Sequence, residues 1–171
     1  ILVVCKFMKL SCLVVARNEE LFVEKCLELL HPFVDEIVFV DMSSEDKTKE
    51  IASKFSKVKI YDYPYSEPVD MGKARTFSLS KCTGDWFLQV DCDEFYPPES
   101  MKKICEFVET TDAISARVPY FNLSWRHGYK QILDHYPDRL YRTDVVEKYE
   151  GVLPRDMTIV KEEFRLVPHK G

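Results

Sequence analysis

Residues 10–19 read LSCLVVARNE, an apolar run followed by a short polar segment. Leu10–Ala16 is a continuous apolar run rich in valine, which is typical of a β-strand buried on both faces. Asn18 is predicted to cap the helix that follows, with Glu19 and Glu20 in its first turn, where the helix dipole favours acidic groups. The chain therefore starts with a buried strand and a helix, as an α/β sheet does.

The alternation of strand and helix continues through the first two thirds of the chain. Apolar residues at helical spacing predict a helix from Phe22 to Leu30, and His31-Pro32 ends it. Further strands are expected at Glu36–Val40, Val58–Tyr61 and Trp86–Val90, and further helices at Lys47–Phe55, at Met71–Lys81 and from Pro98 to Val108. This spacing implies βαβ units and a largely parallel sheet.

The sequence pattern changes after residue 113. Ile114–Phe121 and Arg139–Tyr141 are predicted as strands, but aromatic and charged residues interrupt them and no long helix separates them. We expect one domain over residues 1–171, with a first half at 8–112 and a second half at 113–171, and a truncated second half is one alternative. The predicted fold class is α/β, with a mostly parallel, Rossmann-like sheet flanked by helices and a smaller mixed or antiparallel C-terminal part.

The composition excludes several classes of protein. Lys and Arg total 24 against 29 Asp and Glu, a net charge of −5, whereas surfaces that bind nucleic acid or anionic membranes carry a basic excess. The hydrophobic content of 46% is too high for a disordered chain. Mean hydropathy is −0.24, and no apolar run approaches the roughly 20 residues that span a bilayer.

The six cysteines form no C-x-x-C pair, so a zinc ribbon or a thioredoxin-like site has no support. Several lie inside apolar runs and are expected to be small buried hydrophobic residues of a protein in a reducing compartment; a disulfide scaffold is the alternative. The chain begins at Ile1, which leaves a fragment or a start at Met8 as alternatives, and the end at Gly171 resembles a cut within a fold.

Polar and acidic residues follow three of the predicted strands, and in an open α/β sheet ligands bind at the carboxyl ends of strands. They are Arg17, Asn18 and Glu19, then Asp41, Ser43, Ser44 and Asp46, then Asp91, Cys92, Asp93 and Glu94. Turn formation and helix capping are the ordinary alternative. Three acids within four residues repel one another unless a cation offsets them, and hard oxygen ligands suit Mg²⁺ or Mn²⁺.

A glycine-rich phosphate loop is absent from the sequence, which has only five glycines. Phosphates, if bound, would be held by a metal and by basic side chains. Lys73 and Arg75 are the candidates, on the predicted helix before the fourth strand; an ordinary solvated helix face is the alternative.

Residues 9–98 resemble the nucleotide-binding half of a family 2 glycosyltransferase with the GT-A fold. The resemblance rests on four segments: SCLVVARNE (11–19), VDEIVFVDMSSEDKT (34–48), GKART (72–76) and GDWFLQVDCDE (84–94). In the third, Thr76 replaces the usual Asn. In the fourth, Asp91 and Asp93 form the DxD motif of the family.

The resemblance implies roles for individual residues. Asp41 would hydrogen-bond the nucleobase of a nucleoside-diphosphate sugar, Ala16 and Arg17 would line the base pocket, and Arg75 would approach the nucleotide. The full implied substrate-binding set is Ala16, Arg17, Asn18, Glu19, Asp41, Ser43, Lys73, Arg75 and Asp91. The implied metal ligands are Asp91, which would lie near the ribose or metal, Asp93 and His169.

The second half matches the family less closely. The segments DRLY (138–141) and YEG (149–151) resemble its "RLFR…y-G-vHE" region, but Leu153-Pro154-Arg155-Asp156 replaces the His-Glu pair. Asp156 is therefore the candidate general base that would deprotonate the acceptor hydroxyl. His127 and His135 have no such support and are expected in an acceptor-side loop or on the surface.

These observations predict a glycosyltransferase dependent on Mn²⁺ or Mg²⁺. It would move a sugar with inversion from a nucleoside-diphosphate donor, expected to be uridine-linked, to a hydroxyl of a saccharide or lipid-linked acceptor. We expect no nucleic-acid partner and no transmembrane segment, and a cytoplasmic location with peripheral contact at the inner membrane face left open.

Three alternatives remain. One is a non-catalytic remnant that keeps the nucleotide pocket. A sugar-nucleotide pyrophosphorylase would carry a glycine-rich loop after the first strand, where this chain has Arg17-Asn18-Glu19-Glu20. An aspartate-nucleophile phosphatase would carry its DxD after the first strand, not after the fourth.

Overall fold

The computed structural model describes residues 7–118, 121–124, 129–131, 138–150 and 165–168. The helices are α1 (Val23–Leu30), α2 (Thr48–Ala52), α3 (Met71–Leu79) and α4 (Pro98–Thr110). The first six strands are β1 (Leu10–Ala16), β2 (Glu36–Asp41), β3 (Val58–Asp62), β4 (Trp86–Val90), β5 (Glu94–Phe95) and β6 (Ser115–Arg117). The others are β7 (Phe121–Ser124), β8 (Tyr129–Gln131), β9 (Asp138–Arg142), β10 (Val146–Glu150) and β11 (Arg165–Pro168), with a 3-10 turn at Thr143–Val145.

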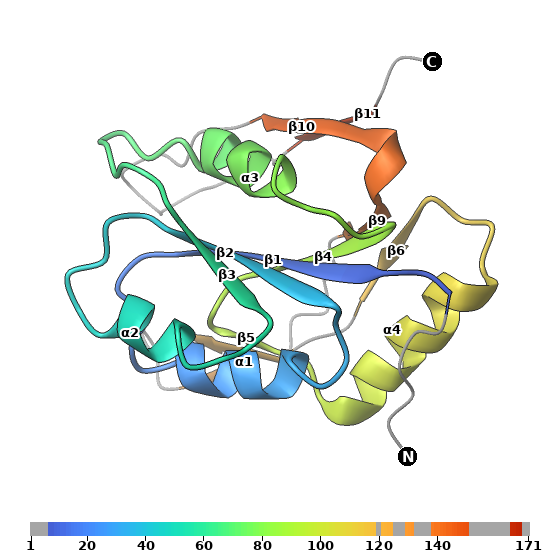
Figure 1. Ribbon diagram of the computed structural model, residues 1–171, viewed down its shortest axis with the longest axis horizontal. Helices are drawn as coiled ribbons and strands as arrows, with labels where there is room; N and C mark the ends of the chain where they lie inside the picture. The colour runs from blue at the N-terminus through green and yellow to red at the C-terminus, as the bar shows by residue number, and fades with distance from the viewer. Residues whose placement is uncertain (1–6, 119–120, 125–128, 132–137, 151–164, 169–171) are drawn as a thin grey trace.

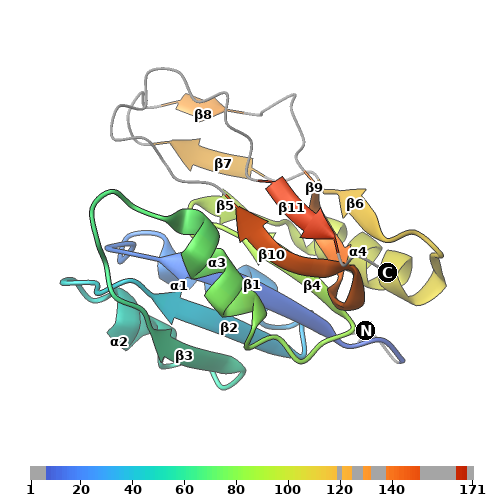
Figure 2. The same cartoon turned by 90° about the horizontal axis from the view of Figure 1, so that it is seen from above.

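The main sheet has the strand order β3-β2-β1-β4-β9-β6. Strands β1 to β4 run parallel to one another, and β9 then pairs antiparallel with both β4 and β6. Helices α1, α2 and α4 cover one face of this sheet, and α3 with the β10–β11 ribbon covers the other (Figure 1). The short sheet β5-β7-β8 lies apart from the main sheet (Figure 2). The expected α/β fold, mostly parallel with an antiparallel part, is confirmed.

Side chains alternate between two hydrophobic cores along each central strand. From β1, Leu10, Cys12 and Val14 pack toward α1 and α4, while Leu13 and Val15 pack toward α3. Both faces of β1, β2 and β4 are buried along their whole length, which is why these strands have uninterrupted apolar sequences. The parallel core holds the carboxyl ends of β1, β2 and β4 in fixed register at one edge.

Two predictions about local structure are wrong. Asn18 does not cap a helix: α1 begins only at Val23, and Glu19 and Glu20 lie in the loop before it. Asn18 has a φ of 56°, in the left-handed region that asparagine tolerates, and its side chain binds another loop. The predicted strand Ile114–Phe121 is two strands, because β6 joins the main sheet and β7 joins β5.

The described cysteines are free thiols. Cys12, Cys26, Cys92 and Cys105 are buried and Cys82 is partly exposed, which confirms their packing as small apolar residues; Cys5 lies outside the described residues. Among the helices of the described ranges, none is long and apolar enough to cross a membrane.

Candidate functional site

The loops after β1 and β2 are tied together by hydrogen bonds across the edge of the sheet. The backbone N–H of Asn18 donates to Ser44 Oγ at 3.0 Å, and its side-chain Oδ1 accepts from the N–H of Glu45 at 2.8 Å. The N–H of Glu19 donates to Thr48 Oγ1 at 2.6 Å. Asn18 thus holds two loops of the site in place, and Ser44 provides an acceptor for it.

Asp41 ends β2 beside Ala16, its register partner on β1. Its Oδ2 accepts a hydrogen bond from the N–H of Ser44 at 3.1 Å, and the residue is 3% exposed. Its Oδ1 is buried and has no hydrogen-bond partner among the described residues. A buried carboxylate oxygen without a donor is costly, so this atom is suited to a donor supplied by a ligand.

Arg17, directly after β1, contacts the loop that follows β3. The guanidinium of Arg17 lies 3.7 Å from the centre of the Tyr65 ring and pairs with Glu45 at 3.4 Å. The hydroxyl of Ser43 accepts from the N–H of Tyr65 at 3.3 Å and donates to the carbonyl of Tyr63 at 3.4 Å. A cation stacked on an aromatic ring offers a flat surface of the kind that a planar base packs against.

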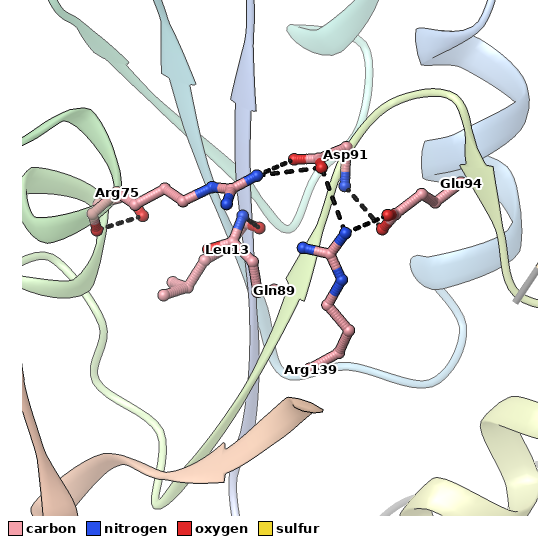
Figure 3. A network of polar contacts seen from close by, with 7 residues as sticks. Leu13, Arg75, Gln89, Asp91, Glu94 and Arg139 are labelled. Carbon is pink, nitrogen blue, oxygen red and sulfur yellow. Dashed lines mark hydrogen bonds and ion pairs between the residues drawn. The ribbon is translucent and has the colours of Figure 1, made fainter. Parts of the chain in front are cut away.

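Asp91–Glu94 form a tight turn at the end of β4. The Asp91 carbonyl accepts from the N–H of Glu94 at 2.9 Å, and the N–H of Asp91 donates to Glu94 Oε2 at 3.2 Å. The backbone and a side chain therefore close the same turn, with Cys92 and Asp93 at its two central positions. Figure 3 shows the Asp91 and Glu94 side chains facing Arg75 and Arg139.

Two arginines converge on Asp91. Nη2 of Arg75, from α3, lies 2.8 Å and 3.0 Å from its two carboxylate oxygens, and Nη2 of Arg139, from β9, lies 3.4 Å away (Figure 3). Arg139 also forms an ion pair with Glu94. Burial alone would raise the pKa of Asp91, but Arg75 and then Arg139 outweigh it and hold the pKa below its ordinary value.

Glu19 faces the acids at the ends of the neighbouring strands. Burial, followed by the negative charges of Asp93, Asp91 and Asp46, raises the pKa of Glu19 to about 7. The strand ends therefore concentrate negative charge, which a divalent cation would neutralise. Within the described ranges no group of three or more His, Cys, Asp or Glu could hold a metal alone. The carboxylates of Asp91 and Asp93 are oxygen donors of the kind that a hard ion takes, and such an ion would need further oxygens from a phosphate.

The family model of glycosyl transferase family 2 matches residues 11–161. The chain belongs to this family. One relative of this chain is an uncharacterized glycosyltransferase of Rickettsia conorii. The two are 30% identical over 96 residues, which are 56% of this chain and 33% of that protein. A TPR repeat-containing protein of Synechococcus elongatus is 26% identical over 126 residues, 68% of this chain and 30% of that protein. The chain thus spans about a third of the length of these relatives.

Solved structures confirm the GT-A glycosyltransferase fold. S. aureus TarS residues 1–349 in complex with UDP superpose with a TM-score of 0.58 at 22% identity, over 80% of this chain and 47% of that 1–349 chain. Glucosyl-3-phosphoglycerate synthase from Mycobacterium tuberculosis, in complex with Mn²⁺, UDP and glucosyl-3-phosphoglycerate, superposes with a TM-score of 0.53 at 22% identity, over 64% of this chain and 42% of that enzyme.

The sequence analysis also named two basic residues that lie on α3 and four residues that lie outside the described ranges. Lys73 is exposed on α3 and pairs with Asp70, the residue that caps the helix, while Arg75 points the other way to Asp91. The structure thus separates two residues that the sequence analysis grouped together. The expectations for Asp156, His169, His127 and His135 fall on residues outside the described ranges.

Sequence reasoning missed Tyr65, whose ring lies against Arg17, and Arg139, which pairs with the acids after β4. Arg139 lies in the DRLY segment that resembles the family, but no local pattern links it to the acids after β4. The link appears only when β9 is placed beside β4, where it brings the guanidinium to Asp91 and Glu94.

Proposed function

We propose that this chain is the donor-binding part of a glycosyltransferase that takes its sugar from a UDP-sugar with the help of a divalent cation. The observation that carries the proposal is the unpartnered, buried Oδ1 of Asp41, whose register partner Ala16 precedes the Arg17 that stacks on Tyr65. The UDP bound to TarS and to the Mycobacterium tuberculosis synthase supports the choice of nucleotide.

The hydrogen bonds of Asp41 favour uracil over guanine. Uracil offers one N–H donor between two carbonyl groups, which matches one open carboxylate oxygen. Guanine offers two adjacent donors, which pair best with both oxygens of a carboxylate, but one oxygen of Asp41 is already bound to the N–H of Ser44.

The metal site is proposed at the DxD turn. Asp91, Asp93 and His169 are the proposed ligands, and Asp93 is assigned the main contact because Asp91 already holds two arginines. The ion, either Mn²⁺ or Mg²⁺, would supply positive charge to the departing diphosphate. Arg75 and Arg139 offset part of the negative charge of the turn. One cation with its bound phosphates would then balance the charge that remains.

The acceptor side rests on the sequence. We propose Asp156 as the general base of an inverting transfer to a hydroxyl of a saccharide or lipid-linked acceptor, in one domain built from halves at 8–112 and 113–171. A cytoplasmic location, with peripheral contact at the membrane face, is part of the same proposal. Asp156→Asn should keep donor affinity while transfer falls by about 10²-fold, and normal transfer would remove Asp156 from the mechanism.

Calorimetric titration of the chain with UDP, with and without Mn²⁺, tests the proposal. We expect UDP binding that Mn²⁺ strengthens, and Asp93→Asn should abolish the metal-dependent part because it removes a charged ligand from a hard-ion site. Asp112→Asn, at an exposed position after α4, is the control. An unchanged metal effect in folded Asp93→Asn would contradict the proposed metal site.

Incubation with a panel of nucleotide sugars and Mn²⁺ tests the chemistry. Hydrolysis or transfer of a UDP-sugar supports the enzyme. Tight binding without turnover supports the non-catalytic remnant instead.

A further inference from the structure

Glu94 is the least exposed acid of the DxD turn, and an arginine on β9 compensates its charge. Its side chain is 2% exposed, and the guanidinium of Arg139, itself 13% exposed, forms an ion pair with it. A carboxylate buried this deeply is strongly destabilising unless a cation and hydrogen bonds compensate its charge. Arg139 follows Glu94 by 45 residues, so this compensation depends on the second half of the chain.

The two oxygens of Glu94 have different partners. Oε1 pairs with Arg139, and Oε2 accepts the N–H of Asp91 at 3.2 Å (Figure 3). The same carboxylate that is neutralised by Arg139 therefore closes the turn that carries Asp93. If Glu94 moves, the hydrogen bond to the N–H of Asp91 is lost and the two central residues of the turn gain freedom.

The pairing of strands fixes where Arg139 can act. In the antiparallel pair of β4 and β9, Leu88 lies opposite Leu140 and Phe87 opposite Tyr141. Arg139 is the next residue of β9 toward the carboxyl end of β4, so its side chain reaches the turn from the α3 face of the sheet. The proposed acceptor-side base, Asp156, follows β9 in the sequence.

We propose that Arg139 is a positioning residue for the metal-binding turn: through Glu94 it holds Asp91–Glu94 in the conformation that presents Asp93 to the cation. This inference rests on the proposed function. Loss of Arg139 should affect the turn more than the contact proposed between Asp41 and the base. Asp91 keeps its contacts with Arg75, and Asp41 lies on another strand.

The proposal predicts a specific loss of metal affinity. In the full 171-residue chain, Arg139→Gln should weaken Mn²⁺ binding in the presence of UDP by about tenfold or more, the usual effect of removing a group that orients a metal ligand. UDP binding without metal should change less than about twofold. Arg139→Lys should recover part of the loss, since it restores the charge but not the planar guanidinium whose Nη2 meets both Asp91 and Glu94.

Two further variants separate positioning from general destabilisation. Arg142→Gln is the matched control, because Arg142 is on the same strand but pairs with Asp144 on the surface. Glu94→Gln should reproduce the loss of Mn²⁺ affinity, and the double variant Glu94→Gln/Arg139→Gln should be no worse than the single variants. Mn²⁺ binding is measured by electron paramagnetic resonance of the free ion and UDP binding by calorimetry, on variants whose folding is checked by circular dichroism.

The outcomes distinguish the two proposals. Unchanged Mn²⁺ affinity in folded Arg139→Gln and Glu94→Gln overturns the positioning role and leaves the proposed function standing. Equal losses of UDP affinity with and without Mn²⁺ also overturn it, since they indicate a merely structural role. If the wild-type chain itself shows no effect of Mn²⁺ on UDP binding, the proposed metal-dependent function fails first.

Discussion

The Glu36 carboxylate accepts a hydrogen bond from the Ser11 hydroxyl at 2.7 Å, at the edge of the sheet opposite the candidate site. These two residues are register partners on β1 and β2. The same carboxylate accepts from the N–H and hydroxyl of Thr83 at 2.6 Å and 2.8 Å, and from Lys59 on β3 at 2.7 Å. One buried acid therefore joins three parallel strands to the segment that enters β4.

Acid should destabilise the fold partly through Glu36. Burial would raise its pKa, but the hydrogen bonds from Lys59, Ser11 and Thr83 outweigh burial and lower the pKa from 4.5 to about 2. The folded state therefore binds this proton less readily than the unfolded chain. The stabilisation is complete above about pH 4.5 and is lost as the pH falls toward 2.

Urea unfolding at several pH values measures this effect. Glu36→Gln should lower the free energy of unfolding at pH 7 by about 1–3 kcal/mol and should lose less stability than the wild type between pH 6 and pH 3. Glu28→Gln, on the exposed face of α1, is the control. An equal acid response in wild type and Glu36→Gln would show that Glu36 does not supply it.

Gly84 should tolerate no side chain. A Cβ at this position would lie 2.5 Å from Ser11 Oγ, 2.8 Å from Ser11 N and 2.9 Å from the carbonyl oxygen of Lys9. Gly84→Ala should lower the free energy of unfolding by about 1–3 kcal/mol, because two of these atoms belong to the backbone and cannot rotate away. Ser11→Ala/Gly84→Ala should recover little. Wild-type stability of Gly84→Ala would contradict this packing.

The sequence predicts best the parts of the fold that are buried on both sides. β1, β2 and β4 are uninterrupted apolar runs because each is covered on both faces, so their positions can be read locally. The strand predicted over Ile114–Phe121 is wrong because its two pieces pair with different partners, β9 and β5. Short strands of this kind depend on tertiary pairing that a local pattern does not contain.

The candidate site divides in the same way. Asp41 and Asp91 stand at the ends of buried parallel strands, and the carboxyl ends of such strands share one edge of the sheet, so the sequence alone is enough to place both acids at that edge. Asn18 resembles a helix cap in sequence, but its side chain binds the N–H of Glu45, 27 residues away. The contact between Arg139 and Glu94 spans 45 residues and is equally invisible to a local pattern.

Thr76 should hold α3 to β10. Its hydroxyl donates to the carbonyl of Gly72 at 2.8 Å and accepts from the N–H of Tyr149 at 2.9 Å. Thr76→Val keeps the shape but leaves that N–H without its acceptor, so it should lower the free energy of unfolding by about 1–3 kcal/mol in urea titrations. Thr76→Ser keeps the hydroxyl and should lose less. Equal effects of Val and Ser would place the role of Thr76 in packing.

Asp41 should set the choice of base independently of the metal. Asp41→Asn replaces one carboxylate oxygen by an NH₂ donor while a carbonyl oxygen remains for the N–H of Ser44, so the N3–H of uracil would meet a donor. UDP affinity should fall by about 1–3 kcal/mol. The preference for UDP over CDP should also fall, because N3 of cytosine is an acceptor. Calorimetry with both nucleotides, with and without Mn²⁺, measures this change.

Asp62→Asn is the matched control for this prediction, because Asp62 lies opposite Asp41 on β3 but is exposed and pairs with Lys49. The loss in Asp41→Asn should be the same in the presence and absence of Mn²⁺, since Asp41 is held at the end of β2 and the turn proposed for the metal follows β4. A loss that appears only with Mn²⁺ would move Asp41 from the base pocket to the metal site. An unchanged ratio of UDP to CDP affinity would mean that Oδ1 of Asp41 does not contact the base.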